Sequence, residues 1–345
     1  MGFFSIFAKD IGIDLGTANT VICSNNEIVL NEPSVVALVE KGGMKVPYTF
    51  GMDAKQMLGK TPLKIDVIRP MKDGVIADFS VASEMIRYFI SKILNNSRYV
   101  FGPVIIICVP SGSTTVERRA IQEAAESVGA RDVWLIEEPM AAAIGTGLPI
   151  LESIGSMCVG IGGGTLEVGV IALGGLVYGN SLRLAGDKMD TMIMDYVRNN
   201  FSLLIGETTA EKVKMTIGSA LPPEDGGSGL TMKIRGRSLT TGIPTEIDIT
   251  EKDVADSLQD SLKEMVGSIS TALQSIPPEL SSDISERGII LSGGGALLKK
   301  IDVAITNATG LKVTIAEDPL FSVVNGINIV MNNFNMYKNV LFKQH

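Results

Sequence analysis

Residues 13–20 read Ile13-Asp14-Leu15-Gly16-Thr17-Ala18-Asn19-Thr20, and residues 159–166 repeat the pattern as Val159-Gly160-Ile161-Gly162-Gly163-Gly164-Thr165-Leu166. Each copy is an apolar strand that enters a turn of small residues and leaves it as a second strand, so both predict a hairpin. Backbone N–H groups at such turns can point at bound phosphate. Two such hairpins facing each other would clamp the phosphates of one ligand. The copies differ where the first has Asp14 and the second has Gly160.

The rest of the chain predicts two halves built on one plan. Strands expected at 104–109 and 133–136 alternate with helices at about 80–95 and 117–128, which favours a mixed α/β sheet. A capping box of Thr114 and Glu117 is expected to open the second of these helices. The second half repeats the plan after residue 150, with an insert at about 182–245. After this insert, a long helix to about Ser275 begins at a capping box formed by Thr250 and Asp253.

A third glycine turn follows the expected strand 288–291. It comprises Gly293, Gly294 and Gly295 and precedes an expected helix over 296–306. A glycine turn at a helix N-terminus can receive the α-phosphate or the sugar of a nucleotide. One such turn is weak evidence, whereas three of them, two in duplicated context, indicate a nucleotide site.

Composition excludes several kinds of chemistry. The net charge is −8 and the basic residues are scattered, so nucleic acid is not expected as a partner. The single histidine, His345, is the last residue, which excludes histidine-based catalysis and metal sites. A metal would be a hard cation on oxygen ligands, Mg²⁺ first. Cys23, Cys108 and Cys158 lie in apolar runs without CxxC spacing, which predicts buried free thiols in a reducing compartment.

No apolar run is long enough to predict a spanning helix, and the N-terminus lacks the basic lead of a secretory signal. It is nevertheless rich in large apolar side chains, and a second apolar tip follows the helix expected to end near residue 95. Both segments are interpreted as contacts with a membrane surface, the alternative being packing against their own lobe. The candidate membrane residues are Phe3, Phe4, Ile6, Phe7, Tyr99, Val100 and Phe101.

Seven segments spread over nearly the whole chain resemble the MreB family of bacterial actins, within the actin, sugar-kinase and Hsp70-like ATPase superfamily. The segments are 14–20 (DLGTANT), 31–34 (NEPS), 69–78 (RPMKDGVIAD), 108–112 (CVPSG), 137–145 (EEPMAAAIG), 200–206 (NFSLLIG) and 291–298 (LSGGGALL). The resemblance implies an α/β actin-like ATPase fold, with two RNase-H-like lobes, a small subdomain inserted in each, and a nucleotide cleft between them.

The resemblance also implies domain boundaries and cofactors. Subdomain IA is expected at 1–32, 66–148 and 316–345, IB at 33–65, IIA at 149–181 and 246–315, and IIB at 182–245. ATP or ADP with Mg²⁺ is the implied ligand. The nucleotide-binding residues that it implies are Gly16, Thr17, Ala18, Asn19, Gly162, Gly163, Gly164, Glu211, Lys214, Gly293, Gly294 and Gly295.

Particular roles transfer by position. Asp14 resembles the carboxylate that holds Mg²⁺ and its waters, its other interpretation being a turn cap. Glu138 resembles the residue that orients the attacking water, and Thr165 a residue that helps to place it. Glu211 and Lys214 match a Glu-x-x-Lys pair that grips the ribose and adenine side, the alternative being an ordinary exposed helix pair.

The departures from the family pattern carry the sharpest expectation. The family has a second Asp where this chain has Gly160, and losing such a partner typically costs about 10- to 100-fold in metal affinity or activity. Ala185 replaces a glycine near the lobe junction, and Lys188 reverses an acidic position after it. We therefore expect ATP binding to persist and hydrolysis to be slow or impaired.

The resulting hypothesis is an ATP-binding, filament-forming bacterial actin of the cell-shape cytoskeleton. Its partners would be copies of itself, other MreB paralogues and the inner face of the cell membrane, where it would lie peripherally from the cytoplasm. An Hsp70-like chaperone and a sugar kinase of the same superfamily are the alternatives, together with a non-hydrolysing scaffold that copolymerises with another MreB. ATP-dependent sedimentation distinguishes the filament from the first two.

Overall fold

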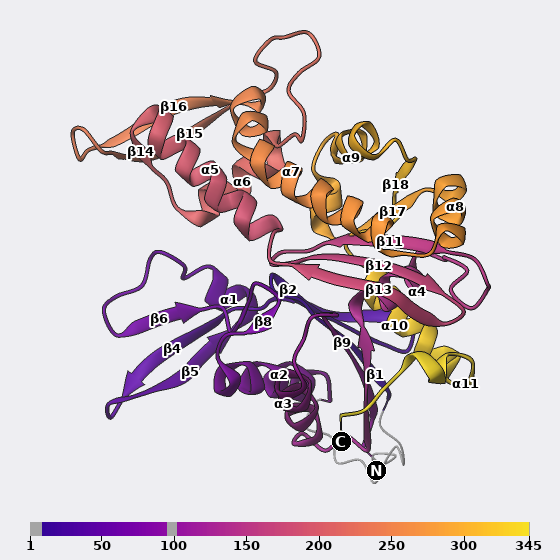
Figure 1. The fold of residues 1–345 in the computed structure, drawn as a ribbon. Coiled ribbons are helices and arrows are strands. Elements are labelled where there is room, and N and C mark those ends of the chain that lie inside the picture. Colours follow the sequence, from indigo (N-terminus) through magenta and orange to yellow (C-terminus); the bar gives the residue numbers. More distant parts are fainter. Residues whose placement is uncertain (1–8, 95–101, 345) are drawn as a thin grey trace.

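The computed structural model describes residues 9–94 and 102–344 and divides them into two lobes (Figure 1). A five-stranded mixed sheet forms the first lobe. Its order is β10 (Asp132–Glu137), β9 (Val104–Val109), β1 (Ile11–Leu15), β2 (Asn19–Ser24) and β3 (Glu27–Pro33). Strands β1, β2 and β3 are antiparallel neighbours, while β9 and β10 run parallel to β1.

The second lobe repeats this sheet. Its order is β13 (Gly175–Leu182), β12 (Leu166–Ala172), β11 (Ser156–Ile161), β17 (Ile289–Ser292) and β18 (Val313–Ile315). The first three strands are again antiparallel, and the last two are again parallel to the first strand of the hairpin. Both predicted hairpins are therefore confirmed, as the central pairs β1–β2 and β11–β12 of two equivalent sheets, and the α/β expectation with them.

A small sheet is inserted into each lobe. In the first lobe it consists of β4 (Val36–Lys41), β5 (Met44–Phe50) and β6 (Ile65–Ile68), beside the short helix α1 (Gly51–Lys55). In the second lobe it consists of β14 (Leu203–Leu204), β15 (Thr231–Ser238) and β16 (Pro244–Thr250), beside α5 (Gly186–Phe201) and α6 (Glu207–Ile217). Figure 1 shows both small sheets on the same side of the molecule, at the left of the view.

Amphipathic helices cover the large sheets. They are α2 (Phe79–Leu94) and α3 (Thr115–Glu126) in the first lobe, and α7 (Glu251–Ser275), α8 (Pro278–Arg287) and α9 (Ile301–Thr309) in the second. Capping boxes begin α3 at Thr114 and α7 at Thr250, each with its acidic partner three residues on, as predicted. Cys23, Cys108 and Cys158 are buried free thiols, which confirms the expected burial and the expected lack of disulfides between them.

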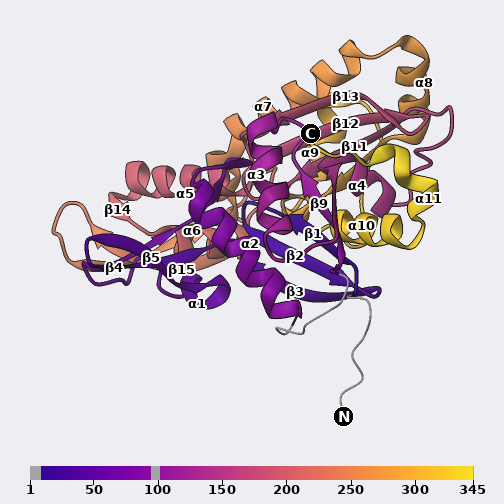
Figure 2. The ribbon, with the colours of Figure 1, turned by 90° about the horizontal axis from the view of Figure 1, so that it is seen from below.

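Two helices lie between the large sheets and join the lobes crosswise (Figure 2). Helix α4 (Glu138–Gly145) follows β10 of the first lobe but contacts β11 and β12 of the second, while α10 (Ser322–Asn332) follows β18 but contacts β1, β2 and β9. They cross through glycines, because a Cβ on Gly145 would lie 1.8 Å from the Ser322 carbonyl oxygen and one on Gly326 would lie 1.8 Å from the Ala141 carbonyl oxygen. The crossing is thus a backbone-to-backbone contact.

One predicted element is wrong. The third glycine turn leads into a single turn of 3₁₀ helix at Gly294–Leu297, and the α-helix begins only at Ile301. Lys300 has a left-handed backbone with φ of 59°, which interrupts any continuous helix over 296–306. Ser219 and Lys299 form a β-bridge there, so a tertiary pairing prevailed over the local helical pattern.

The remaining described elements are short. They are β7 (Met71–Lys72), β8 (Val75–Ile76), α11 (Phe334–Tyr337) and a 3₁₀ turn at Lys338–Val340. None of the described helices has the length and apolar character to cross a membrane. The candidate membrane residues at 3, 4, 6, 7 and 99–101 lie outside the described residues, as does His345.

We expect the Gly326→Ala variant to unfold more easily than the wild type. Its new methyl group would press on the Ala141 carbonyl, and overpacking of this kind costs about 1–3 kcal/mol or more. Gly267→Ala, on α7 with no atom within 4 Å of the added Cβ, is the control and should be neutral or stabilising. Urea unfolding midpoints measure both, and equal midpoints for Gly326→Ala and wild type would contradict the crossing as described.

Candidate functional site

The two glycine turns touch each other across the lobes. A Cβ added to Gly163 would lie 2.6 Å from the Ala18 Cβ, and one added to Gly164 would lie 2.7 Å from Thr17 Oγ1. The Gly74 N–H donates to Thr17 Oγ1 over 3.2 Å on the first-lobe side. The turns therefore face each other as the repeat predicted, at a distance that only glycine allows on the second turn.

The third turn lies beside the second. A Cβ on Gly295 would lie 2.2 Å from Ile161 Cγ2, and Ile161 directly precedes the second turn. The Gly293 N–H donates to the Pro319 carbonyl over 2.7 Å. All three glycine turns are thus gathered at one place, although the third does not open an α-helix.

Helix α5 begins on the second turn. The N–H groups of Gly186 and Asp187 donate to the carbonyl oxygens of Gly162 and Gly163, over 3.2 and 2.8 Å. Ala185 precedes the helix and is fully buried, whereas Lys188 is exposed. The small inserted domain of the second lobe is therefore attached directly to the turn that is expected to hold phosphate.

Three carboxyl groups lie beside these turns. Burial raises the pKa of Asp14, at the end of β1, to about 7. Burial, and then the negative charges of Glu167 and Asp14, raise the pKa of Glu138 well above its usual value. Burial also raises the pKa of Glu167, against hydrogen bonds from serines that lower it. No positively charged side chain contributes to the shifts of Asp14 and Glu138, so these acids lie in a negative, poorly hydrated region.

Gly160 lies in the same region. A Cβ built on it would have only ordinary contacts, 3.4 Å from Ser292 Oγ, 3.8 Å from Glu138 Oε1 and 3.8 Å from the Glu167 Cβ. The position has room for a side chain, and a carboxylate there would face Glu138. The geometry of the site would therefore accept an acidic side chain at position 160.

The donor set fits a hydrated hard cation. Buried acids with raised pKa values and without a cationic partner are most stable when a positive charge is bound beside them. Within residues 9–94 and 102–344, however, no three His, Cys, Asp or Glu side chains are arranged to hold a metal ion directly. The protein would therefore hold Mg²⁺ mainly through water molecules and phosphate oxygens, which is how this ion is usually bound.

Thr165 is buried directly after the second turn. A Cβ on Gly74 would lie 2.2 Å from Thr165 Cγ2, so a first-lobe loop closes over this threonine. The predicted residues Asp14, Glu138 and Thr165 thus lie around the contact between the turns.

Ion pairs bridge the lobes farther out, beside the two small inserted sheets. Lys55 Nζ lies 2.9 Å from Glu211 Oε1, and Arg69 pairs with Asp187 at 2.9 Å and with Glu207 at 3.3 Å. Glu211, predicted to grip the nucleotide, is therefore occupied by a lysine of the opposite lobe. These cross-lobe pairs were not predicted, although Arg69 belongs to one of the quoted family segments.

Lys214 faces inward from α6. Its Nζ donates to the Gly186 carbonyl and to Asp190, both over 2.9 Å. Burial raises the pKa of Asp190 to about 6, against the lowering effect of Lys214. Lys214 thus supports the start of α5, which is hydrogen-bonded to the second glycine turn, rather than pairing with Glu211.

Glu167 was missed by the sequence analysis. It is the single charge in the strand Leu166–Ala172, all of whose residues are buried. Its Oε2 accepts from the N–H of Ser111 over 3.2 Å and from Ser111 Oγ over 2.6 Å, and Ser111 belongs to the loop after β9 of the other lobe. A lone acid in an otherwise apolar strand was the signal that could have identified it.

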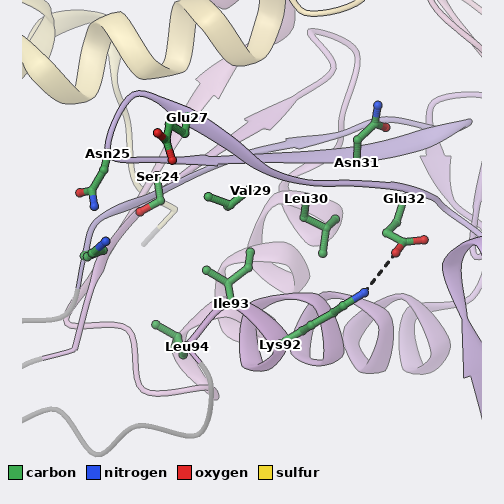
Figure 3. A pocket seen from close by; sticks show the side chains of 11 residues that line it. Ser24, Asn25, Glu27, Val29, Leu30, Asn31, Glu32, Lys92, Ile93 and Leu94 are labelled. Atoms are coloured by element: carbon green, nitrogen blue, oxygen red, sulfur yellow. Dashed lines mark hydrogen bonds and ion pairs between the residues drawn. The ribbon is translucent and has the colours of Figure 1, made fainter. Parts of the chain in front are cut away.

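A pocket of about 610 Å³ lies elsewhere, between β3 and the end of α2 (Figure 3). Val29, Leu30 and Ile93 supply apolar lining, and Lys92 donates to Glu32 over 3.1 Å at one end. None of the predicted nucleotide residues lines it. It therefore does not belong to the site formed by the turns.

Comparison with known proteins agrees with this geometry. The family described as MreB/Mbl protein matches residues 8–339. The cell shape-determining protein MreB of Escherichia coli (strain K12) is 50% identical over 345 residues, covering 99% of each chain. The crystal structure of MreB5 of Spiroplasma citri bound to ADP is 33% identical with a TM-score of 0.88, covering 96% of this chain and 98% of that one. The same protein bound to AMPPNP is 32% identical, with the same TM-score and coverage.

We expect Gly164→Ala to weaken nucleotide binding. Its Cβ would force Thr17 and the second turn apart, at a cost of about 1–3 kcal/mol, equivalent to about 5- to 150-fold in affinity. Gly206→Ala, in the same lobe with no atom within 4 Å of the added Cβ, is the matched control. Titration of a fluorescent ATP analogue gives both affinities, and an unchanged value for Gly164→Ala would show that contact between the turns is not needed for binding.

Proposed function

The chain belongs to the MreB/Mbl family of bacterial actin homologues, and we propose that it is a filament-forming protein of the cell-shape cytoskeleton that binds ATP with Mg²⁺ and hydrolyses it slowly. The observation that carries the slow hydrolysis is Gly160, which removes a carboxylate from an otherwise complete set of turns and acids. ATP would act mainly as a conformational ligand that favours one arrangement of the lobes.

Nucleotide binding is supported by the contact between the turns. Backbone N–H groups of the turns at 16–19 and 162–164 would bind the phosphates, and the third turn at 293–295 would contact the sugar side. Glu211 would have to leave Lys55 before it could grip the ribose, so binding and the cross-lobe ion pair would compete. Lys214 would contribute to nucleotide binding from its position beside Gly186.

Hydrolysis would depend on Glu138 and Thr165. Glu138 would accept a hydrogen bond from the attacking water and orient it toward the γ-phosphate, with Thr165 limiting where that water can lie. Bound Mg²⁺ would neutralise part of the phosphate charge. Asp14 would orient waters on that ion from the first lobe. Without an acid at position 160 the attacking water lacks one orienting partner, so turnover would fall while binding persisted.

Self-association and peripheral membrane contact are proposed from family membership and from the apolar segments at 3–7 and 99–101. The subdomain boundaries predicted above stay predictions. A scaffold that copolymerises without hydrolysis is the second candidate, and Gly160 is the observation that favours it. An Hsp70-like or sugar-kinase activity has no such support in this chain.

ATP-dependent sedimentation tests the assembly. The pure protein should pellet with ATP and stay in solution without nucleotide, because closure of the lobes would create the polymerising surface. Protein that pellets only when a related subunit is added would favour the scaffold. Protein that stays in solution, with turnover that rises on addition of peptide or sugar, would contradict the filament.

Phosphate release tests the role of position 160. Gly160→Asp should release phosphate faster, by about 10- to 100-fold, because the acid would fit without a clash and face Glu138. Gly267→Asp, which adds the same charge on the exposed side of α7, should leave the rate unchanged. No gain in Gly160→Asp would refute impaired hydrolysis through the missing carboxylate.

A further inference from the structure

Glu167 has one oxygen bound and one without a partner. Its side chain is 0% exposed, and Oε2 accepts both hydrogen bonds from Ser111. The buried Oε1 forms no hydrogen bond, although the hydroxyl of Ser181, the partner of Glu167 in the β12–β13 ladder, is near enough to lower the pKa of this acid. A buried carboxylate oxygen without a partner is costly. The arrangement therefore leaves Oε1 available to a hydrogen-bond donor that is not part of the protein chain.

The place of Glu167 indicates what that is. Gly160 and Glu167 are directly opposed in the β11–β12 ladder, so their side-chain positions lie on the same face of the sheet. The Cβ of Glu167 lies 3.8 Å from the position that a Cβ on residue 160 would take, and Glu138 Oε1 lies 3.8 Å from that same position. Glu167 is thus the acid of the chain that neighbours the empty position from the same lobe.

The charges around it agree. The negative charge of Glu167 is the largest charge effect on Glu138, ahead of that of Asp14. The three acids therefore share one poorly hydrated region, to which Asp14 contributes from the first lobe and Glu167 from the second. A cation bound between the two turns would require acids from both lobes, as found here.

We propose that Glu167 is a positioning residue that replaces the missing acid at position 160, its Oε1 accepting a hydrogen bond from water on the Mg²⁺ that accompanies the nucleotide. The inference rests on the proposed function and deepens it. Glu167 approaches from the neighbouring strand, so it would support the ion without restoring the partner of the attacking water. Nucleotide binding and hydrolysis would thereby be affected differently by Gly160.

A purely structural role is the competing explanation, because Ser111 ties Glu167 to the other lobe. Two variants separate the roles. Glu167→Gln keeps an oxygen that can accept both Ser111 hydrogen bonds and removes the charge. Ser111→Ala removes the side-chain hydrogen bond and keeps the charge. A structural role makes Ser111→Ala the more damaging change, and a role toward the ion makes Glu167→Gln the more damaging one.

The experiment measures ADP affinity by calorimetry with excess Mg²⁺ and with EDTA, for the full chain. The ratio of the two affinities is the Mg²⁺ enhancement. We expect a clear enhancement in the wild type and in Ser111→Ala, and a loss of about 10-fold or more in Glu167→Gln. Adding Gly160→Asp to Glu167→Gln should restore it, and Mn²⁺ paramagnetic resonance of the ADP complex should follow the same order. Glu137→Gln, whose side chain pairs with Arg118, is a matched control.

Each outcome decides between the explanations. An equal enhancement in Glu167→Gln and wild type would overturn the inference and leave the proposed function intact. Equal losses in Ser111→Ala and Glu167→Gln would overturn it in favour of a structural role. A wild type without any enhancement would contradict Mg²⁺-dependent nucleotide binding itself, and the inference with it. Rescue by Gly160→Asp also shows that the Glu167→Gln chain is folded.

Discussion

The close contact between two turns of backbone is the constraint on which the rest of the site depends. Gly163 and Gly164 meet Ala18 and Thr17 with no room for even one more carbon atom. Because each turn belongs to a hairpin at the centre of its sheet, this contact fixes the position of the two sheets relative to each other. The same contact sets the positions of the acids at the ends of β1 and of the β11–β12 hairpin, and of the beginning of α5.

The cross-lobe ion pairs act at the other end of the same gap. From the opposite lobe, Arg69 pairs with the acids that begin α5 and α6, and Lys55 pairs with Glu211 farther along α6. They are partly exposed, so each pair alone contributes little to stability. Their importance is geometric, since one of their partners, Glu211, is also the residue expected to reach the nucleotide.

Much of the fold followed from local signals. The hairpins were readable because apolar strands met small-residue turns twice, and α3 and α7 because Thr114 and Thr250 each had an acid three residues on. The helix expected over 296–306 failed because its periodicity says nothing of the bridge between Ser219 and Lys299. Likewise, the contact of Ser111 with Glu167 and the pairs of Lys55 and Arg69 join residues far apart in the chain, and only the folded structure reveals them.

The glycine crossing of α4 and α10 lies on the far side of the turns from the ion pairs. Because the helices touch backbone to backbone, the lobes cannot approach further there, and each helix is packed into the sheet of the opposite lobe. A rotation of one lobe about this crossing would therefore move the small outer sheets over a longer arc than the phosphate turns, because the outer sheets lie farther from it.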